Sequence, residues 1–208
     1  NAWVRTEADL ADWEPENDND DPRDTDVEAL AARDAPGSVL RKRFRLWQEI
    51  ARKKIPTCVS VWSLPGWMYE NPDGDRNAYG RRVRPEMWPE MIECIASYLA
   101  YARSRYGIEH DLFSFNEPDA GIRVHFRAEE HLRAIADIGA RLRSLGLKTR
   151  LLLGDVARPD RLDYVLPALD APETLEYVGA LAFHTWGGAG AADYNNWSEL
   201  AERIGKPL

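Results

Sequence analysis

The stretch FSFNEPDAG, residues 113–121, decides the fold prediction for this chain. An apolar segment typical of a β-strand runs into Asn116, Glu117 and Pro118, where a turn is expected. A carboxylate at the end of an apolar strand is costly to bury unless it has a partner or a task. The position of Glu117 therefore predicts a polar site at the carboxyl end of a strand.

Predicted strands and helices alternate along the chain. Apolar and β-branched runs predict strands at residues 2–6, 55–62, 111–116, 149–155 and 179–186. Apolar residues at helical spacing predict helices at residues 38–54, 85–106, 128–146, within 161–178 and around 197–204. The last residues, 205–208, predict a helix cap followed by the start of another strand.

This alternation predicts an α/β fold with parallel strands and right-handed crossovers. A doubly wound sheet needs a glycine-rich phosphate turn after an early strand, and residues 61–67 (VWSLPGW) lack that spacing. A (β/α)8 barrel instead builds its active site at the carboxyl ends of its strands. Four side chains end predicted strands in this way: Trp62, Glu117, Asp155 and His184. Their positions favour the barrel.

The chain is short for a complete barrel. A (β/α)8 barrel takes about 250 residues, whereas this chain has 208 residues and five predicted strands. We therefore predict a single incomplete TIM barrel domain over residues 1–208, with strands missing at both ends.

Composition excludes several classes of partner. The chain is 44% hydrophobic and 30% charged, which is typical of a soluble globular protein. No apolar run approaches about 18 residues, so no membrane span is predicted. A net charge of -8 argues against a nucleic-acid partner. Cys58 and Cys94 lie in apolar periodic segments and are predicted to be buried free thiols.

Neither a metal nor a cofactor is predicted. The histidines are scattered, and of the four only His184 lies at the predicted catalytic face. The acidic segment ENDNDDP, residues 16–22, lacks the glycine and the terminal glutamate of a calcium loop. We therefore interpret it as a solvated or substrate-contacting loop. A metal-dependent hydrolase is the alternative that inhibition by chelators would indicate.

Two motifs resemble those of glycoside hydrolases. Asn116-Glu117-Pro118 looks like the fourth-strand motif of the retaining (β/α)8 glycoside hydrolases of clan A. SVWSLPGWM, residues 60–68, resembles the third-strand pattern S-P-W-S-P-P-x-W-M of glycoside hydrolase family 30. It departs from that pattern at Val61 and Leu64, which replace prolines, and Phe115 replaces the usual glutamine before Asn-Glu-Pro. By this resemblance the strands present are the second to the sixth, with the seventh begun.

The resemblance implies a retaining hydrolase of β-linked polysaccharides or oligosaccharides that works by double displacement. In the clan, the glutamate matching Glu117 is the general acid/base, and the asparagine matching Asn116 contacts the sugar 2-hydroxyl. The clan's nucleophile is a glutamate at the end of the seventh strand, which is expected beyond Leu208. The 208 residues alone are then expected to be inactive, and the whole protein to be secreted.

Further side chains are predicted to bind the sugar. Indole faces stack on the C–H patches of pyranose rings, and Trp62, Trp67 and Trp186 lie at or just after strand ends. His184, in AFHTW, is similar to the sixth-strand His-x-Tyr of such barrels. Arg5 is expected to orient the acid/base pair or a sugar hydroxyl, or else to be a structural ion-pair partner.

Alternatives remain at the level of single residues and of function. Trp67 and Trp13 are equally compatible with the core, and Asp155 is interpreted as a hydrogen-bonding or helix-capping residue. A barrel that binds carbohydrate without catalysis would use the same tryptophans. The sequence predicts no oligomeric state.

Overall fold

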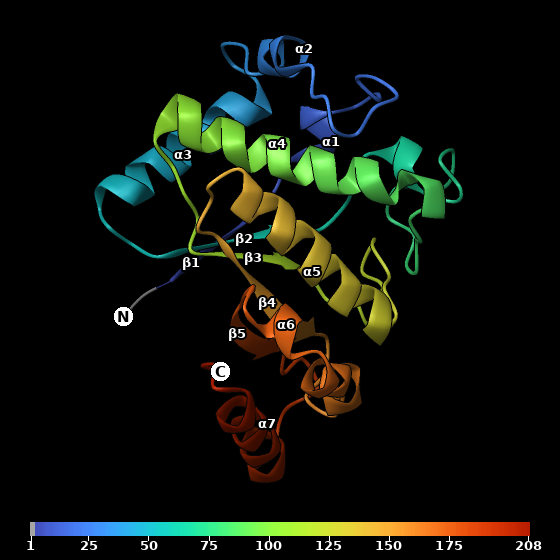
Figure 1. Cartoon of the computed structure of the whole chain (residues 1–208), viewed down its shortest axis with the longest axis vertical. Helices are drawn as coiled ribbons and strands as arrows, with labels where there is room; N and C mark the ends of the chain where they lie inside the picture. The colour runs from blue at the N-terminus through green and yellow to red at the C-terminus, as the bar shows by residue number, and fades with distance from the viewer. Residues whose placement is uncertain (1–2) are drawn as a thin grey trace.

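The computed structural model describes residues 3–208 and contains one parallel β-sheet with helices packed against it (Figure 1). Its strands are β1 (Val4–Glu7), β2 (Thr57–Val61), β3 (Leu112–Phe115), β4 (Arg150–Val156) and β5 (Val178–Phe183). They are hydrogen-bonded in the order β1-β2-β3-β4-β5, and every pair is parallel. A doubly wound sheet reverses its strand order, whereas this sequential order is that of a barrel wall. The predicted partial TIM barrel is confirmed.

Longer helices connect most of these strands. The α-helices are α1 (Leu10–Trp13), α2 (Val27–Ala32), α3 (Val39–Arg52), α4 (Trp88–Tyr106), α5 (Ala128–Ser144), α6 (Pro172–Leu175) and α7 (Ala191–Ile204). Short 3-10 helices are η1 (Gly66–Met68), η2 (Pro85–Met87), η3 (Leu162–Tyr164) and η4 (Leu166–Asp170). Figure 1 shows α4 and α5 running side by side. Helix α7 lies at the far end of the molecule, where its Trp197 stacks on Phe183 of β5.

Most predicted elements agree with the structure within a few residues. The predicted first strand began at Ala2, which lies outside the described residues. The helix predicted within 161–178 is reduced to η3, η4 and the single turn α6, because Pro167 and Pro172 interrupt the backbone hydrogen bonding. Residues 206–208 do not form a strand, although the Pro207 carbonyl accepts a hydrogen bond from the Leu181 N–H (2.8 Å).

The two faces of the sheet carry different side chains. Val59, Phe113 and Phe115 belong to the hydrophobic core that the sheet shares with the helices. Ser60 and Ser114 alternate with them and are paired in register on adjacent strands, where their hydroxyls form a hydrogen bond. Because side chains alternate along a strand, small polar groups line the face of the sheet that turns away from the helices.

The core lies between the sheet and helices α3 and α4. Trp13 and Trp47 are buried there and form edge contacts with Phe44 and Tyr98. Trp13 is 1% exposed, so this residue belongs to the core and not to a sugar site. Cys58 and Cys94 are free and buried, as predicted.

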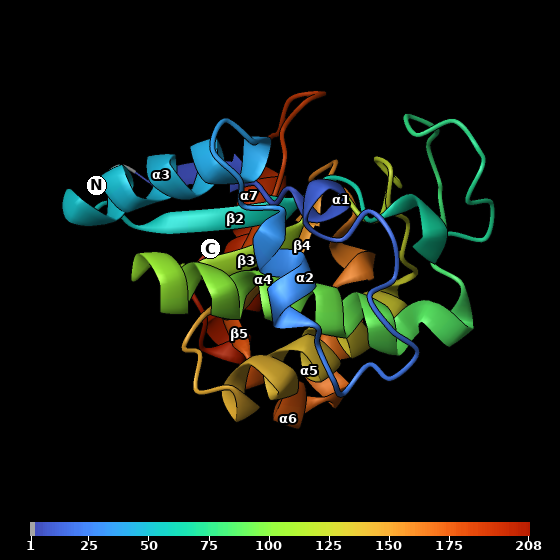
Figure 2. The same cartoon turned by 90° about the horizontal axis from the view of Figure 1, so that it is seen from above.

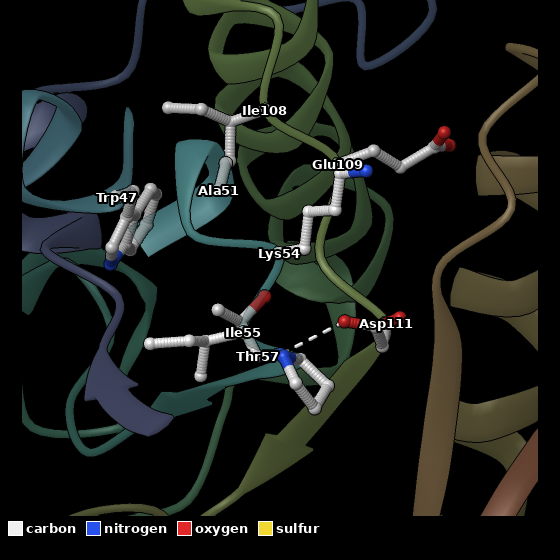
Figure 3. A pocket seen from close by; sticks show the side chains of 9 residues that line it. Trp47, Ala51, Lys54, Ile55, Thr57, Ile108, Glu109 and Asp111 are labelled. Atoms are coloured by element: carbon white, nitrogen blue, oxygen red, sulfur yellow. Dashed lines mark hydrogen bonds between the residues drawn. The ribbon is translucent and has the colours of Figure 1, made fainter. Parts of the chain in front are cut away.

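A pocket at the amino ends of β2 and β3 is lined by Trp47, Lys54 and Asp111, and Figure 3 shows Asp111 accepting the Thr57 N–H (2.8 Å). It lies at the end of the strands opposite to Glu117, the end that in barrels serves stability. None of the helices in residues 3–208 combines the length and apolar character that a bilayer crossing requires.

Candidate active site

A cluster of polar side chains forms at the carboxyl ends of the strands. Arg5 lies on β1, Asn116 and Glu117 follow β3, Asp155 lies near the end of β4, and His184 follows β5. Parallel strands place these ends at one edge of the sheet, so residues far apart in sequence meet there. Hydrogen bonds or close contacts join all five.

Arg5 is the centre of the cluster. Its guanidinium donates to both carboxylate oxygens of Asp155, Nη1 to Oδ1 (2.9 Å) and Nη2 to Oδ2 (2.7 Å). Nη2 also donates to Asn116 Oδ1 (2.7 Å). This contact orients the Asn116 amide so that its Nδ2 is left buried without a hydrogen-bond partner in residues 3–208. Arg5 therefore forms an ion pair with Asp155 and also contacts the neighbour of Glu117, and its role towards a sugar stays a prediction.

Asp155 is a buried anion. Burial by itself raises the pKa of this carboxyl, but the His184 side chain and the Arg5 charge outweigh burial and hold the pKa below its ordinary value. Asp155 Oδ1 lies 3.1 Å from His184 Nε2. The interpretation of Asp155 as a hydrogen-bonding residue is confirmed, and both of its oxygens are committed to neighbours.

Glu117 lies beside the two aromatic side chains that follow β5. The Trp186 indole N–H donates to Glu117 Oε1, and His184 Nε2 lies 3.7 Å from the same oxygen. The rings of His184 and Trp186 stack, with centroids 5.3 Å apart and planes 11° from parallel. Trp186 is 75% exposed, so its ring presents one open face next to the carboxyl group of Glu117.

The backbone at the site is strained. Glu117 and Asp155 have φ values of 48° and 55°, in the left-handed region that L-residues rarely adopt. Neither is a glycine, so each costs on the order of 1–3 kcal/mol. Strain of this kind persists where the surroundings impose it, and it concentrates at functional sites. At both residues the left-handed conformation turns the backbone sharply at the end of the strand.

The remaining predicted tryptophans differ in placement. Trp62 is 37% exposed directly after β2, so its ring is available at the same edge of the sheet. Trp67 is half-buried, packs against the core, and donates its Nε1–H to the Glu14 carbonyl (3.1 Å). No bond joins Trp67 to the cluster around Arg5, and its role in binding sugar stays a prediction.

Sequence reasoning missed the floor of the site. Ser114 lies on β3, two residues before Asn116. Its hydrogen bonding helps to hold the pKa of Asp155 below the ordinary value. Its hydroxyl also contacts the Ser60 hydroxyl. The signal was present in TCVSV and LFSF, where Ser60 and Ser114 each stand between two apolar residues of a strand.

Comparison with solved structures identifies the architecture. SrfJ from Salmonella typhimurium matches 99% of this chain and 46% of its own, with a TM-score of 0.71 and 21% identity. A glycoside hydrolase family 30 subfamily 8 xylanase from Clostridium acetobutylicum matches with a TM-score of 0.68 and 17% identity, over 98% of this chain and 46% of the xylanase. A GH30 endoxylanase from Clostridium papyrosolvens matches with a TM-score of 0.63 and 16% identity, over 95% and 47%.

This chain has the fold of a partial (β/α)8 barrel. It spans less than half the length of each of these structures, and at such low identity the likeness concerns the fold alone. No protein-family model and no curated protein matches the sequence.

Proposed function

We propose that this chain is part of the catalytic domain of a secreted, family 30-like retaining glycoside hydrolase acting on a β-linked polysaccharide or oligosaccharide. Two structural matches are xylanases by name, which makes xylan the first substrate to test. The proposal rests on one observation in the site. A glutamate on strained backbone at a strand end accepts a hydrogen bond from the N–H edge of an exposed indole.

Glu117 has the surroundings that a general acid/base requires. Its side chain is 10% exposed, so it reaches the edge of the site, and Trp186 and His184 contact one of its carboxylate oxygens. A sugar stacked on the open face of Trp186 would bring a glycosidic oxygen towards this carboxyl group. Glu117 would protonate the leaving group in the first step and activate water in the second.

Asn116 supplies a neutral donor next to the acid. Its Nδ2 has no partner in residues 3–208, and an unmade hydrogen bond of a buried group costs about 1–3 kcal/mol. A sugar hydroxyl that accepts from Nδ2 would recover this free energy. Because Arg5 fixes the other end of the amide, the donor is oriented before substrate arrives.

Asp155 is unsuited to be the nucleophile. Both of its oxygens are hydrogen-bonded to the Arg5 guanidinium, which stabilises the anion and lowers its nucleophilicity. In retaining enzymes the two catalytic carboxyl groups lie about 5–5.5 Å apart. We propose that the second carboxylate is a glutamate on a strand that follows Leu208 in the complete protein.

Glu117→Gln in the complete protein tests the proposal. With a nucleophile present, the variant should lose a factor on the order of 10²–10⁴ in turnover of xylan or another β-glycan. Aryl glycosides with good leaving groups should lose far less, because their departure needs no proton. Release of reducing sugar and of nitrophenolate would be measured in parallel.

Glu129→Gln, which alters an exposed glutamate of α5, is the matched control and should keep full activity. Near wild-type turnover of a natural glycan by Glu117→Gln would remove Glu117 from the mechanism. Oligosaccharide binding without any hydrolysis by the complete protein would favour a non-catalytic carbohydrate-binding barrel.

A further inference from the structure

Three carboxylates from two segments meet on the outer side of α4. Glu14 follows α1, Asp18 lies in the acidic segment after it, and Glu93 lies on α4. One oxygen of each lies within 4.8 Å of the others. Figure 2 shows α2 and this part of the chain crossing over α4, and a hydrogen bond from the Thr25 hydroxyl to Glu93 Oε1 joins the two layers.

The cluster contains buried oxygens that lack partners. Glu14 is 0% exposed and Glu93 is 1% exposed. Within residues 3–208, both carboxylate oxygens of Glu14 and Oε2 of Glu93 have no hydrogen-bond partner. The ion pairs formed by arginines in residues 3–208 use other carboxylates. Buried carboxylates without a counter-charge need either a cation or a proton.

The same surroundings bind protons strongly. Burial, and then the charge of Glu93, raise the pKa of Glu14 to about 8. Burial raises the pKa of Glu93 to about 7; the Thr25 hydroxyl opposes this shift, and the charges of Asp18 and Glu90 add to it. At neutral pH, a metal ion at this position would therefore compete with protons.

We propose that Glu14, Asp18 and Glu93 bind a calcium ion, which joins the acidic segment to α4. Calcium accepts carboxylate oxygens at about 2.3–2.6 Å in irregular geometry, and oxygens that lie within 4.8 Å of one another can share one such ion. Magnesium demands a smaller and more regular shell of ligands. Zinc prefers nitrogen and sulfur ligands, whereas this cluster offers carboxylate oxygens.

The site is tied to the rest of the fold through backbone contacts. The carbonyl of Glu14 accepts the indole N–H of Trp67, and the N–H of Asp26 donates to Asp18 Oδ2 (2.5 Å). Asp18 is half-exposed, which leaves one side of the cluster open to water molecules that can complete the coordination shell. Calcium is thus expected to stabilise the segment on which Trp67 rests.

Thermal unfolding of the EDTA-treated chain tests the site. At pH 8, 1 mM CaCl2 should raise the Tm by about 3 °C or more relative to NaCl of equal ionic strength. Glu14→Gln should abolish this response, and without calcium its Tm should equal or exceed that of the wild type, because a buried unpaired charge is removed. Glu93→Gln should also abolish the response.

Glu16→Gln is the matched control, because Glu16 lies in the same segment but is exposed. It should keep the calcium response. The proposed site would be wrong if 5 mM CaCl2 left the wild-type Tm unchanged. It would also be wrong if Glu16→Gln lost the Tm rise as completely as Glu14→Gln does. An equal Tm rise with MgCl2 would overturn the choice of calcium.

One measurement on the wild type does not depend on the folding of a variant. Trp13 and Trp67 lie next to the cluster, so excitation at indole wavelengths should sensitise the luminescence of bound terbium, and calcium should displace the terbium. Absence of sensitised terbium emission would contradict the proposal.

Discussion

The backbone N–H of Glu117 donates to the carbonyl oxygen of Asp155 at 3.0 Å, and both residues adopt left-handed backbone. Each turn lies at the carboxyl end of a strand, and the hydrogen bond locks one turn against the other. As a result, the Glu117 carboxyl is held relative to the Arg5–Asp155 ion pair by backbone as well as by side chains. We expect this link to maintain the geometry of the site even when single side chains are replaced.

Relief of the strain at Glu117 should stabilise the chain. Glu117→Gly removes the Cβ penalty of the left-handed conformation and should raise the free energy of unfolding by up to about 1 kcal/mol. Lys54 is exposed and has φ 53°, so Lys54→Gly should give a similar gain. Glu129→Gly in α5 should cost about 1 kcal/mol instead. Urea unfolding measures all three, and a large loss in Glu117→Gly would argue against strain at this position.

Removal of the Arg5 guanidinium should destabilise the fold. Arg5→Met leaves Asp155, which is 1% exposed, without its counter-charge. Because Arg5 itself is 33% exposed, water recovers part of the loss, and we expect a cost of roughly 2 kcal/mol, below that of a fully buried pair. Arg52→Met breaks an exposed pair with Glu49 and should change stability by less than about 0.5 kcal/mol. If chemical denaturation gave the same loss of stability for Arg5→Met and Arg52→Met, the buried charge of Asp155 would not depend on Arg5 for its stabilisation.

Trp62 and Trp47 should respond to truncation in opposite ways. Trp47 is 0% exposed, so Trp47→Ala should cost about 3–5 kcal/mol of stability. Trp62→Ala should keep the fold but weaken oligosaccharide binding in the complete protein by about 1 kcal/mol or more. Calorimetric titration with xylo- and gluco-oligosaccharides is the measurement. A variant that unfolds, yet binds sugar normally when folded, would place Trp62 in the core.

Acid should destabilise the chain through His131. This side chain is buried, and its Nε2 accepts the Gly154 N–H (3.1 Å), which requires the neutral ring. Burial lowers the pKa of His131 to about 4. Between pH 6.5 and 4 the unfolded chain binds a proton at this histidine and the folded chain does not. The free energy of unfolding therefore decreases by up to about 3 kcal/mol as the pH is lowered through this range.

His131→Gln provides the comparison, because its amide oxygen can accept the same N–H without titrating. Its stability should fall less than that of the wild type between pH 6.5 and 4. His110, whose pKa burial also lowers to about 4, contributes equally to both proteins and cancels in the difference. Parallel pH dependences in the two proteins would show that His131 is not held neutral.

The sequence by itself determined the order of strands and helices and the position of Glu117 at a strand end. These are local properties, because apolar periodicity, helix caps and the turn at Pro118 depend on neighbouring residues. Local rules failed within residues 161–178, where apolar spacing favoured a helix but two prolines divided it.

Only the tertiary structure decided which side chains meet. Arg5 and Asp155 are 150 residues apart, and Glu14, which follows α1, meets Glu93 of α4 although the two lie far apart in the sequence. No periodicity encodes such pairs, because their proximity depends on strand register and on the direction in which each crossover returns. The charges of the acidic segment predicted solvation, whereas Asp18 of this segment meets the buried side chains of Glu14 and Glu93 in a cluster that needs a cation or protons.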